Sequence, residues 1–283
     1  MNNEIKNKQF DEERALYNLK DTLVSNCTFA GHADGESVLK EARNLEVESC
    51  DFSLRYPLWH VRKFFLNKVA MDEKTRAALW YDADGIISDC RLNGIKALRE
   101  CDDVSIKNTI VDSPEFGWKC RNISVEDSLL NSEYVFLDAK NIKLNNVKMS
   151  GKYSFQYIEN LEVTNSELNT KDAFWHTKNV TVKDSVVNGE YLGWYSENLT
   201  FINCRISGTQ PLCYCKNLNL INCTMDESCD LAFEYSDVNA EIKGSVTSIK
   251  NPKSGKIVVD GVGEIIREDA VMECNGEVVV KNI

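Results

Sequence analysis

Apolar and polar residues recur along this chain with a fixed period of 19 residues. The repeating unit reads Asn–apolar–x–apolar–x–Asn/Asp–small–x–apolar, and we take its first residue as the anchor. The regular anchors are Asp103, Asn122, Asn141, Asn160, Asn179, Asn198 and Asn217, and looser copies start at Asp21, Asn44, Lys63 and Asp84. A short internal repeat of this kind indicates a solenoid whose units stack on one another.

The positions inside each unit predict strands and bends. Aliphatic residues stand one and three positions after the anchor, as Leu161 and Val163 do, which predicts a short strand with one buried face. Asn or Asp follows at the fifth position, as at Asn165, and suits a bend because these residues tolerate left-handed backbone angles. A second apolar position, such as Leu168, comes eight residues after the anchor. This leaves no room for the helical segment of a leucine-rich repeat.

We therefore expect an all-β chain that forms a right-handed parallel β-helix with 19-residue coils. Residues 18–243 would hold about eleven coils. Residues 1–17 are expected to cap one end, because exposed strand edges invite association. Residues 244–283 lack the period and would form a C-terminal β cap, in which Lys256–Ile283 alternates like short antiparallel strands.

Composition excludes several classes of partner. Lys plus Arg number 33 against 44 Asp plus Glu, a net charge of −11, which disfavours nucleic acid and polyanionic sugars as ligands. The sequence contains no run of about 18 apolar residues, so it predicts no membrane span. Met1–Arg14 is polar and lacks the apolar core of a secretory signal, so the expected location is the cytoplasm. The sequence does not indicate an oligomeric state.

Eleven cysteines without an export signal predict free thiols in a reducing compartment. Five of them share the position six after the anchor with Ser and Thr, and three share the position two before it, which marks small buried residues. No C-x-x-C occurs and there are only three His, so we expect no metal and no cofactor.

The candidate site is the position three residues before the anchor, which we call the outer strip. Its members are Glu41, His60, Tyr81, Glu100, Lys119, Asp138, Tyr157, His176, Tyr195 and Tyr214. Charged side chains are rarely buried without partners, so the strip is expected to be exposed. Its ligand-binding candidates, with two neighbouring tryptophans, are His60, Tyr81, Tyr157, His176, Tyr195, Tyr214, Trp175 and Trp194.

All five tryptophans fall one residue earlier, in what we call the tryptophan column. It consists of Lys40, Trp59, Trp80, Arg99, Trp118, Leu137, Gln156, Trp175, Trp194 and Cys213. One interpretation places the indoles beside the outer strip, where sugar rings could stack on aromatic faces. The other places them in the core, because strand alternation puts adjacent positions on opposite faces.

Glu100, Lys119, Asp138 and His176 are the weak candidates for catalysis. Glu100 and Asp138 would lie two coils apart, about 9.6 Å along the axis. This is near the upper limit of about 9.5 Å for the carboxyl pair of an inverting glycosidase. Lys119 would lie between them and stabilise both carboxylates, which weakens the case for a general acid. Outside the repeat, the loop Gly31–Glu36 holds a second group of ionisable residues, which includes His32. Its simpler interpretation is a polar surface loop.

Four stretches carry a family resemblance: Gly151–Gln156 (GKYSFQ), Lys171–His176 (KDAFWH), Gly189–Tyr195 (GEYLGWY) and Gly208–Cys215 (GTQPLCYC). With them the chain resembles a bacterial family of unknown function that is expected to be pectin-lyase-like. The resemblance implies the β-helix and brings no activity. The catalytic signatures Gly-His-Gly and Arg-Ile-Lys of pectin-lyase-like enzymes are absent, so no catalytic residue is carried over.

Two functions follow as hypotheses. The first is a β-helix that binds or modifies carbohydrate through the outer strip, with an oligosaccharide as its partner. The second is a non-enzymatic structural or protein-interaction solenoid, because the polar positions are repetitive along the whole chain.

Overall fold

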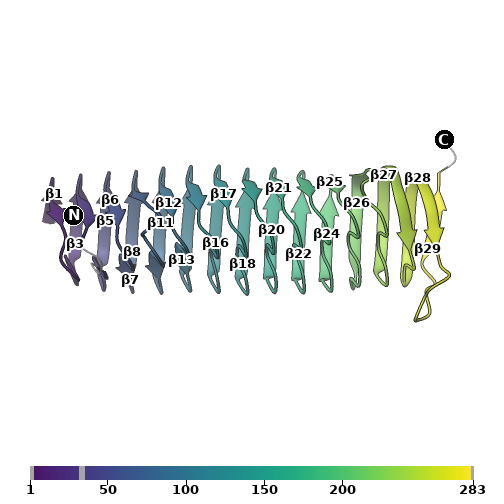
Figure 1. The fold of residues 1–283 in the computed structure, drawn as a ribbon, viewed down its shortest axis with the longest axis horizontal. Coiled ribbons are helices and arrows are strands. Elements are labelled where there is room, and N and C mark those ends of the chain that lie inside the picture. Colours follow the sequence, from purple (N-terminus) through teal and green to yellow (C-terminus); the bar gives the residue numbers. More distant parts are fainter. Residues whose placement is uncertain (1–2, 32–35, 282–283) are drawn as a thin grey trace. The chain divides into compact units, whose positions relative to one another are not determined.

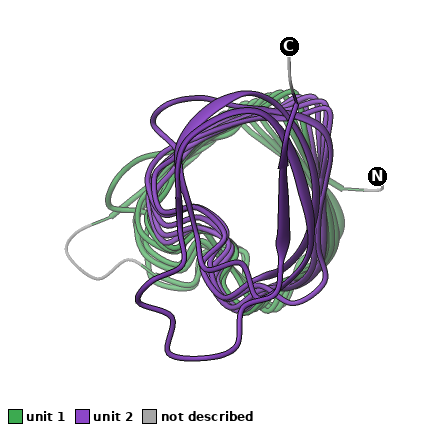
Figure 2. Cartoon of the chain, turned by 90° about the vertical axis from the view of Figure 1, so that its right-hand side faces the viewer, with its two compact units in different colours: residues 1–143 green, residues 144–283 purple. Residues whose placement is uncertain are grey.

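The computed structural model describes residues 3–31 and 36–281, and it divides the chain into two compact units, Met1–Lys143 and Leu144–Ile283. Both units are parallel β-helices, with about 14 turns in the chain (Figure 1). Viewed from the end, the coils inside each unit follow nearly the same outline (Figure 2). Over the described ranges there are strands and turns but no α-helix, and hence no helix suited to crossing a membrane.

Unit 1 repeats a long strand, a short strand and, in three coils, a two-residue third strand. Its first coil has β1 (Asn3–Lys6) and β2 (Gln9–Phe10). The long strands are β3 (Lys20–Ser25), β5 (Arg43–Glu48), β8 (Arg62–Asn67), β11 (Ala83–Ser88), β14 (Asp102–Lys107) and β16 (Arg121–Glu126). The short strands are β4 (Thr28–Ala30), β6 (Asp51–Ser53), β9 (Ala70–Met71), β12 (Arg91–Asn93), β15 (Ile110–Asp112) and β17 (Leu129–Asn131). The third strands are β7 (Leu58–Trp59), β10 (Leu79–Trp80) and β13 (Leu98–Arg99).

Unit 2 has the same plan, followed by longer strands. Its long strands are β20 (Glu159–Thr164), β22 (Lys178–Lys183) and β24 (Glu197–Ile202), and its short strands are β19 (Lys148–Ser150), β21 (Glu167–Asn169), β23 (Val186–Asn188) and β25 (Arg205–Ser207). Then come β26 (Leu218–Met225), β27 (Asp237–Lys250), β28 (Ser254–Ile266) and β29 (Glu277–Val280). Strand β18 (Lys140–Asn145) spans the division between the units.

Parallel pairing confirms the repeat that the sequence predicts. Leu161 pairs with Val180 and Val180 with Leu199, each 19 residues further on. The bend residue Asn165 has a φ of 51°, as expected for its left-handed position. The anchors are left-handed as well, for example Asn160 at 61°, although they lie inside the strands.

The expectation of an antiparallel C-terminal cap is wrong. Strand β28 pairs parallel with β27, and β29 pairs parallel with β28. At the N-terminal end the pairing is parallel too, because β1 pairs with β3. Alternation of apolar and polar residues is the same in parallel and antiparallel strands, so the pattern of the tail could not distinguish them.

The core is a stack of apolar side chains in register. Phe29 stacks on Phe52 with ring centroids 4.7 Å apart, and Phe155 stacks on Phe174 at 5.2 Å. All four rings are at most 1% exposed. Burying a phenylalanine contributes on the order of 2–3 kcal/mol, so this inner column stabilises the coils in both units.

The small positions that flank the strands have a specific role at the corners. The backbone N–H of Cys27 donates to Sγ of Cys50 in the next coil, and that of Ser166 donates to Oγ of Ser185. A buried N–H needs a partner, and a small side chain with an acceptor atom supplies one without filling the core. This explains why Cys, Ser and Thr exchange at these positions. Burial also raises the pKa of the Cys50 and Cys90 thiols to about 11, which makes them poor nucleophiles.

Candidate functional site

The outer strip lies at one corner of the coils, and every member has a positive φ, between 50° and 63°. The residues two positions before and one position after each member are buried, as Phe155 and Ile158 are around Tyr157. The left-handed corner turns the intervening side chain outward. Five of the ten strip residues are exposed and five are half-buried, so the expected exposure holds for part of the strip.

In unit 2 the strip is a column of rings, which we call the aromatic ladder: Tyr157, His176, Tyr195 and Tyr214. The centroids of Tyr157 and His176 lie 5.0 Å apart, those of His176 and Tyr195 5.0 Å, and those of Tyr195 and Tyr214 4.7 Å. The first two pairs are within 7° of parallel, and Tyr157 and Tyr195 are 56% and 47% exposed.

This geometry changes the expected mode of sugar binding. Because the rings of the ladder lie face to face, the faces between them are covered and cannot hold a sugar ring. Their edges point outward instead, so the ladder offers tyrosine hydroxyls and imidazole nitrogens in a line. The ladder is therefore a hydrogen-bonding surface with a rigid aromatic backing.

The ladder has a further ring that the repeat does not reveal. Tyr235 follows Tyr214 at a centroid distance of 5.5 Å, but it is only 8% exposed. It lies 21 residues after Tyr214 instead of 19, so it falls outside the regular period. Burial raises the pKa of Tyr214, which is the more enclosed end of the exposed ladder.

The tryptophan column is neither core nor fully exposed surface. Its five indoles are half-buried, and Trp175 and Trp194 stack 5.4 Å apart beside the ladder. The indole N–H of Trp175 donates to the carbonyl oxygen of Tyr191 at 2.6 Å, and that of Trp194 to Gln210 at 2.8 Å. Trp118 does the same, whereas the indole N–H groups of Trp59 and Trp80 are buried without a partner in the part of the chain that the structure describes. A choice between inward and outward positions could not anticipate this half-buried arrangement.

In unit 1 the outer strip holds charged pairs instead of a ring column. Nδ1 of His60 lies 2.9 Å from a carboxylate oxygen of Glu41, and its ring lies 5.3 Å from that of Tyr81 at a tilted angle. Glu100 accepts a hydrogen bond from Nε of Arg99 at 3.0 Å. The remaining members, Lys119 and Asp138, are exposed.

Two other groups from the sequence analysis are quickly placed. His32 lies outside the described residues. All eleven cysteines are free, and all except Cys274 are buried, as expected for small core residues. Among residues 3–31 and 36–281, no group of three or more His, Cys, Asp or Glu side chains is arranged to hold a metal ion.

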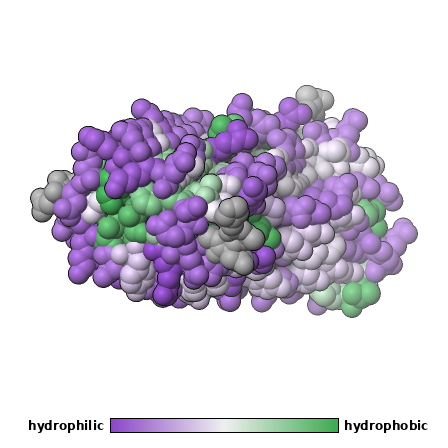
Figure 3. Space-filling model, turned by 60° about the vertical axis from the view of Figure 1, so that its left-hand side comes forward, coloured by the Kyte–Doolittle hydropathy of each residue, from purple (hydrophilic) through white to green (hydrophobic). Residues whose placement is uncertain are grey.

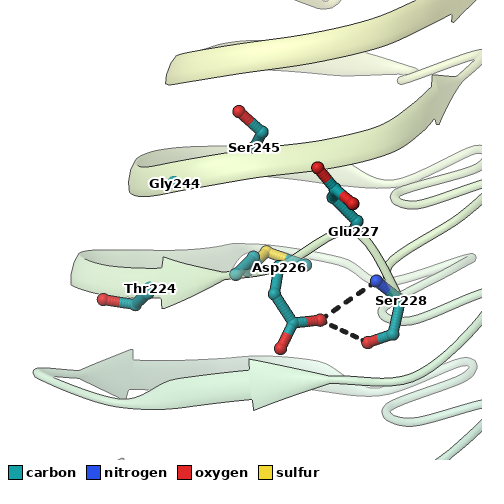
Figure 4. A pocket seen from close by; sticks show the side chains of 7 residues that line it. Thr224, Asp226, Glu227, Ser228, Gly244 and Ser245 are labelled. Carbon is teal, nitrogen blue, oxygen red and sulfur yellow. Dashed lines mark hydrogen bonds between the residues drawn. The ribbon is translucent and has the colours of Figure 1, made fainter.

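A surface hollow in unit 2 lies where β26 passes into the next turn (Figure 4). Its acidic residue Asp226 accepts hydrogen bonds from the backbone N–H of Ser228 at 3.0 Å and from the Ser228 hydroxyl. These bonds lower the pKa of Asp226. Gly208 in turn donates its N–H to the Ser228 hydroxyl. The polar groups of the hollow bond one another, as in a well-formed turn, so it is the weaker candidate.

Fold and site together define a parallel β-helix with an outward line of ring edges on its second unit. The chain belongs to the family described as a protein of unknown function (DUF3737), whose profile matches residues 3–279. No curated protein is similar in sequence.

Solved structures with the same kind of fold are distant in sequence. The A-module of mannuronan C-5 epimerase AlgE6 of Azotobacter vinelandii has a TM-score of 0.43 and 11% identity, over 99% of this chain and 89% of that one. PfbA, a surface adhesin of Streptococcus pneumoniae, has a TM-score of 0.41 and 7% identity, over 93% of this chain and 80% of that one. The AlgE4 A-module has a TM-score of 0.32 and 8% identity, over 99% and 89%.

Proposed function

We propose that this protein binds an oligosaccharide along the aromatic ladder of unit 2. The observation that carries the proposal is the line of outward ring edges at Tyr157, His176, Tyr195 and Tyr214, spaced 4.7–5.0 Å apart. Such a spacing is close to the length of one sugar ring in an extended chain. Each unit of the ligand would then meet one ring edge.

The chemistry of the ladder suits hydroxyl groups. A tyrosine hydroxyl both donates and accepts hydrogen bonds, and an imidazole does the same with its two nitrogens. Because the rings are already stacked, little side-chain entropy is lost when a ligand binds. The net charge of −11 favours a neutral saccharide over an anionic polymer.

We limit the proposal to binding. Of the catalytic candidates, Glu100 is already bonded to Arg99, and His176 lies face to face between two tyrosine rings. Neither arrangement gathers the acid, the base and the space for a substrate that glycoside hydrolysis requires.

A structural or interaction role is the second candidate. The exposed column of anchor asparagines, which includes Asn179, Asn198 and Asn217, favours it. Nδ2 of Asn198 donates to Asn179 at 2.9 Å, and Nδ2 of Asn217 donates to Asn198 at 2.8 Å. These polar side chains bond one another along the coils, so they need no ligand to be satisfied. Such a column stabilises a solenoid whatever the protein binds.

A glycan array with the full-length protein tests the binding proposal. We expect one class of neutral oligosaccharide to bind, and Tyr195→Phe to weaken that binding about threefold to tenfold by removing one hydroxyl. His176→Ala should weaken it further, because it interrupts the ladder.

Tyr17→Phe is the matched control, since Tyr17 is 50% exposed but lies outside the outer strip. Its glycan binding should equal that of the wild type. The proposal would be wrong if the wild type bound no glycan on a broad array, or if Tyr17→Phe and Tyr195→Phe had equal effects.

A further inference from the structure

One buried carboxyl group in unit 1 is out of place in the pattern of the coils. Asp82 stands two residues before its anchor, where the neighbouring coils have Val61 and Cys101. Its side chain is only 1% exposed. Oδ1 accepts the backbone N–H of Val61 at 2.7 Å, which is the corner role that Cys and Ser fill elsewhere. Oδ2 is also buried, and no hydrogen-bond partner for it exists among the described residues.

When the Asp82 carboxyl is protonated on Oδ2, it is a hydrogen-bond donor without an acceptor among the residues that the structure describes. Burial raises the pKa of this carboxyl well above its usual range, with Cys101 contributing as a neighbouring group. Burial thus favours the neutral, protonated form of this carboxyl over the charged one. A buried hydroxyl without an acceptor is costly. An acceptor atom from a ligand would remove that cost.

A pocket opens next to Asp82 where two successive coils have short side chains. The position one before the anchor holds Arg43, Arg62 and Arg121 in other coils of unit 1, but Ala83 and Asp102 in these two. The pocket at these coils has a volume of about 390 Å³. The gap is lined by Arg62, Tyr81, Asp82, Ala83, Glu100, Cys101, Asp102, Lys119 and Arg121.

The charges around the gap favour an anion. Arg62, Lys119 and Arg121 contribute three positive charges, while Glu100 and Asp102 contribute two negative ones, so the lining carries one net positive charge when Asp82 is protonated. The two anions also have partners already. Glu100 is bonded to Arg99, and Asp102 accepts a hydrogen bond from the side chain of Asn122 at 2.8 Å.

We propose that this pocket binds the carboxylate of a small organic acid, with Asp82 donating its carboxyl proton in a hydrogen bond to the ligand and the Lys119 and Arg121 side chains offsetting its charge. The single net positive charge fits a monocarboxylate better than a dianion such as sulfate, which would meet Glu100 and Asp102 with excess negative charge. The site is separate from the aromatic ladder and does not depend on the binding proposed there.

Calorimetric titration of the full-length protein at pH 5 tests this site, with acetate, lactate and glucuronate as probes. Inorganic sulfate, a dianion at this pH, and glucose serve as the comparison ligands. We expect at least one carboxylate to bind more tightly than sulfate, and glucose not to bind in this pocket. The absence of binding for all three carboxylates, or tighter binding of sulfate, would overturn the proposal.

Asp82→Ser separates the proposed role from the structural one. Serine stands at the equivalent position in Ser196 and Ser236, where Ser236 accepts the N–H of Cys215 in the same way. The Ser236 hydroxyl donates its own proton to the carbonyl oxygen of Leu212 at 2.6 Å. By analogy, the variant should keep the corner bond but offer no donor to a ligand, and weaken carboxylate binding about tenfold or more. Asp82→Asn keeps a donor and should retain binding within about threefold. Equal binding by Asp82→Ser and wild type would contradict the assignment.

Two further measurements keep the test decisive if Asp82→Ser does not fold. Lys119→Met should weaken binding about threefold to tenfold, whereas Lys178→Met, an exposed lysine of unit 2, should not. An equal loss in both variants would indicate nonspecific attraction and overturn the site. Tyr195→Phe should leave carboxylate binding unchanged, so failure of this proposal is distinguishable from failure of the ladder.

The pH dependence of binding gives a last readout. Ionisation of Asp82 at high pH would place its charge beside the ligand, so wild-type binding should fall as pH rises, and Asp82→Asn should hold its affinity. The groups that face this carboxyl are Arg43, Arg62, Tyr81, Glu100, Cys101, Asp102, Lys119 and Arg121. An identical pH profile in the two proteins would contradict the role of Asp82.

Discussion

The outer strip has the same backbone in both units but different side chains. In unit 1 it holds a His–Glu pair, a tilted tyrosine and charged groups, and in unit 2 it holds stacked rings. Yet φ is 61° at His60 and 55° at His176. One histidine bonds a carboxylate, and the other lies between two tyrosines. The corner conformation therefore does not depend on what the strip contains.

The difference shows which residues maintain the fold. Buried neighbours on both sides of each strip residue are apolar or small in both units, except for Asp82 beside Tyr81, and they pack against the adjacent coils. The strip side chain makes few of these contacts, so it can vary. On the face shown in Figure 3 the largest exposed apolar area lies toward the left, smaller apolar spots lie elsewhere, and the rest is largely polar. Function is thus expected in the strip and stability in the inner columns.

The largest effects should come from the inner columns, and they should be alike in both units. Phe29→Ala in unit 1 and Phe174→Ala in unit 2 each remove a ring that is 0% exposed, and each should lower the free energy of unfolding by about 3–5 kcal/mol. Urea titration followed by circular dichroism measures this. Phe65→Ala removes a ring that is 37% exposed and should cost well under half as much. A loss confined to one unit would contradict the idea of a common inner support.

Replacing the two histidines should separate the units by a smaller amount. His176→Ala removes two stacked contacts and should lower the free energy of unfolding by about 1–2 kcal/mol. His60→Ala removes no stacked contact, only a tilted contact with Tyr81, an edge contact with Trp59 and one partly exposed pair, and should cost about 0.5 kcal/mol. His176→Phe keeps the stacking and should restore most of the loss. Equal losses at both histidines in the same urea titration would show that stacking adds nothing.

The repeat made most of the fold predictable, because period-two strands and Asn bends are local signals. The register of Leu161 with Val180 and the exposure of Tyr157 followed from it. Less predictable was what depends on the atoms of the next coil. The thiol of Cys50 is a hydrogen-bond acceptor for a backbone N–H, and Trp175 bonds a carbonyl 16 residues further along the chain.

The candidate site was predictable as a list of positions but not as a surface. The spacing in the sequence predicted that Tyr195 and Tyr214 belong to the same outer strip. The orientation of their rings, however, depends on side-chain rotamers. Because the rings stack, the ladder offers ring edges and not ring faces to a ligand. The pocket at Ala83 was also hidden, because two short side chains in successive coils, Ala83 and Asp102, form a gap only between the long side chains of Arg62 and Arg121.

The smallest expected effect concerns the Glu41–His60 pair of unit 1 and depends on pH. The hydrogen bond from His60 lowers the pKa of Glu41, and the nearby Arg43 contributes. A carboxyl whose pKa is lower in the folded state stabilises the fold above its unfolded pKa of 4.5 and loses that contribution as pH falls through the folded value.

Glu41→Gln should therefore lower the free energy of unfolding by about 0.2–1 kcal/mol at pH 6 and by less at pH 3. High salt should reduce the difference at pH 6. Glu46→Gln on strand β5, which follows Glu41, is the control for the loss of one negative charge. If Glu41→Gln matched it at both pH values, the pair would contribute nothing, and unit 1 would differ from unit 2 only in what its strip presents to a ligand.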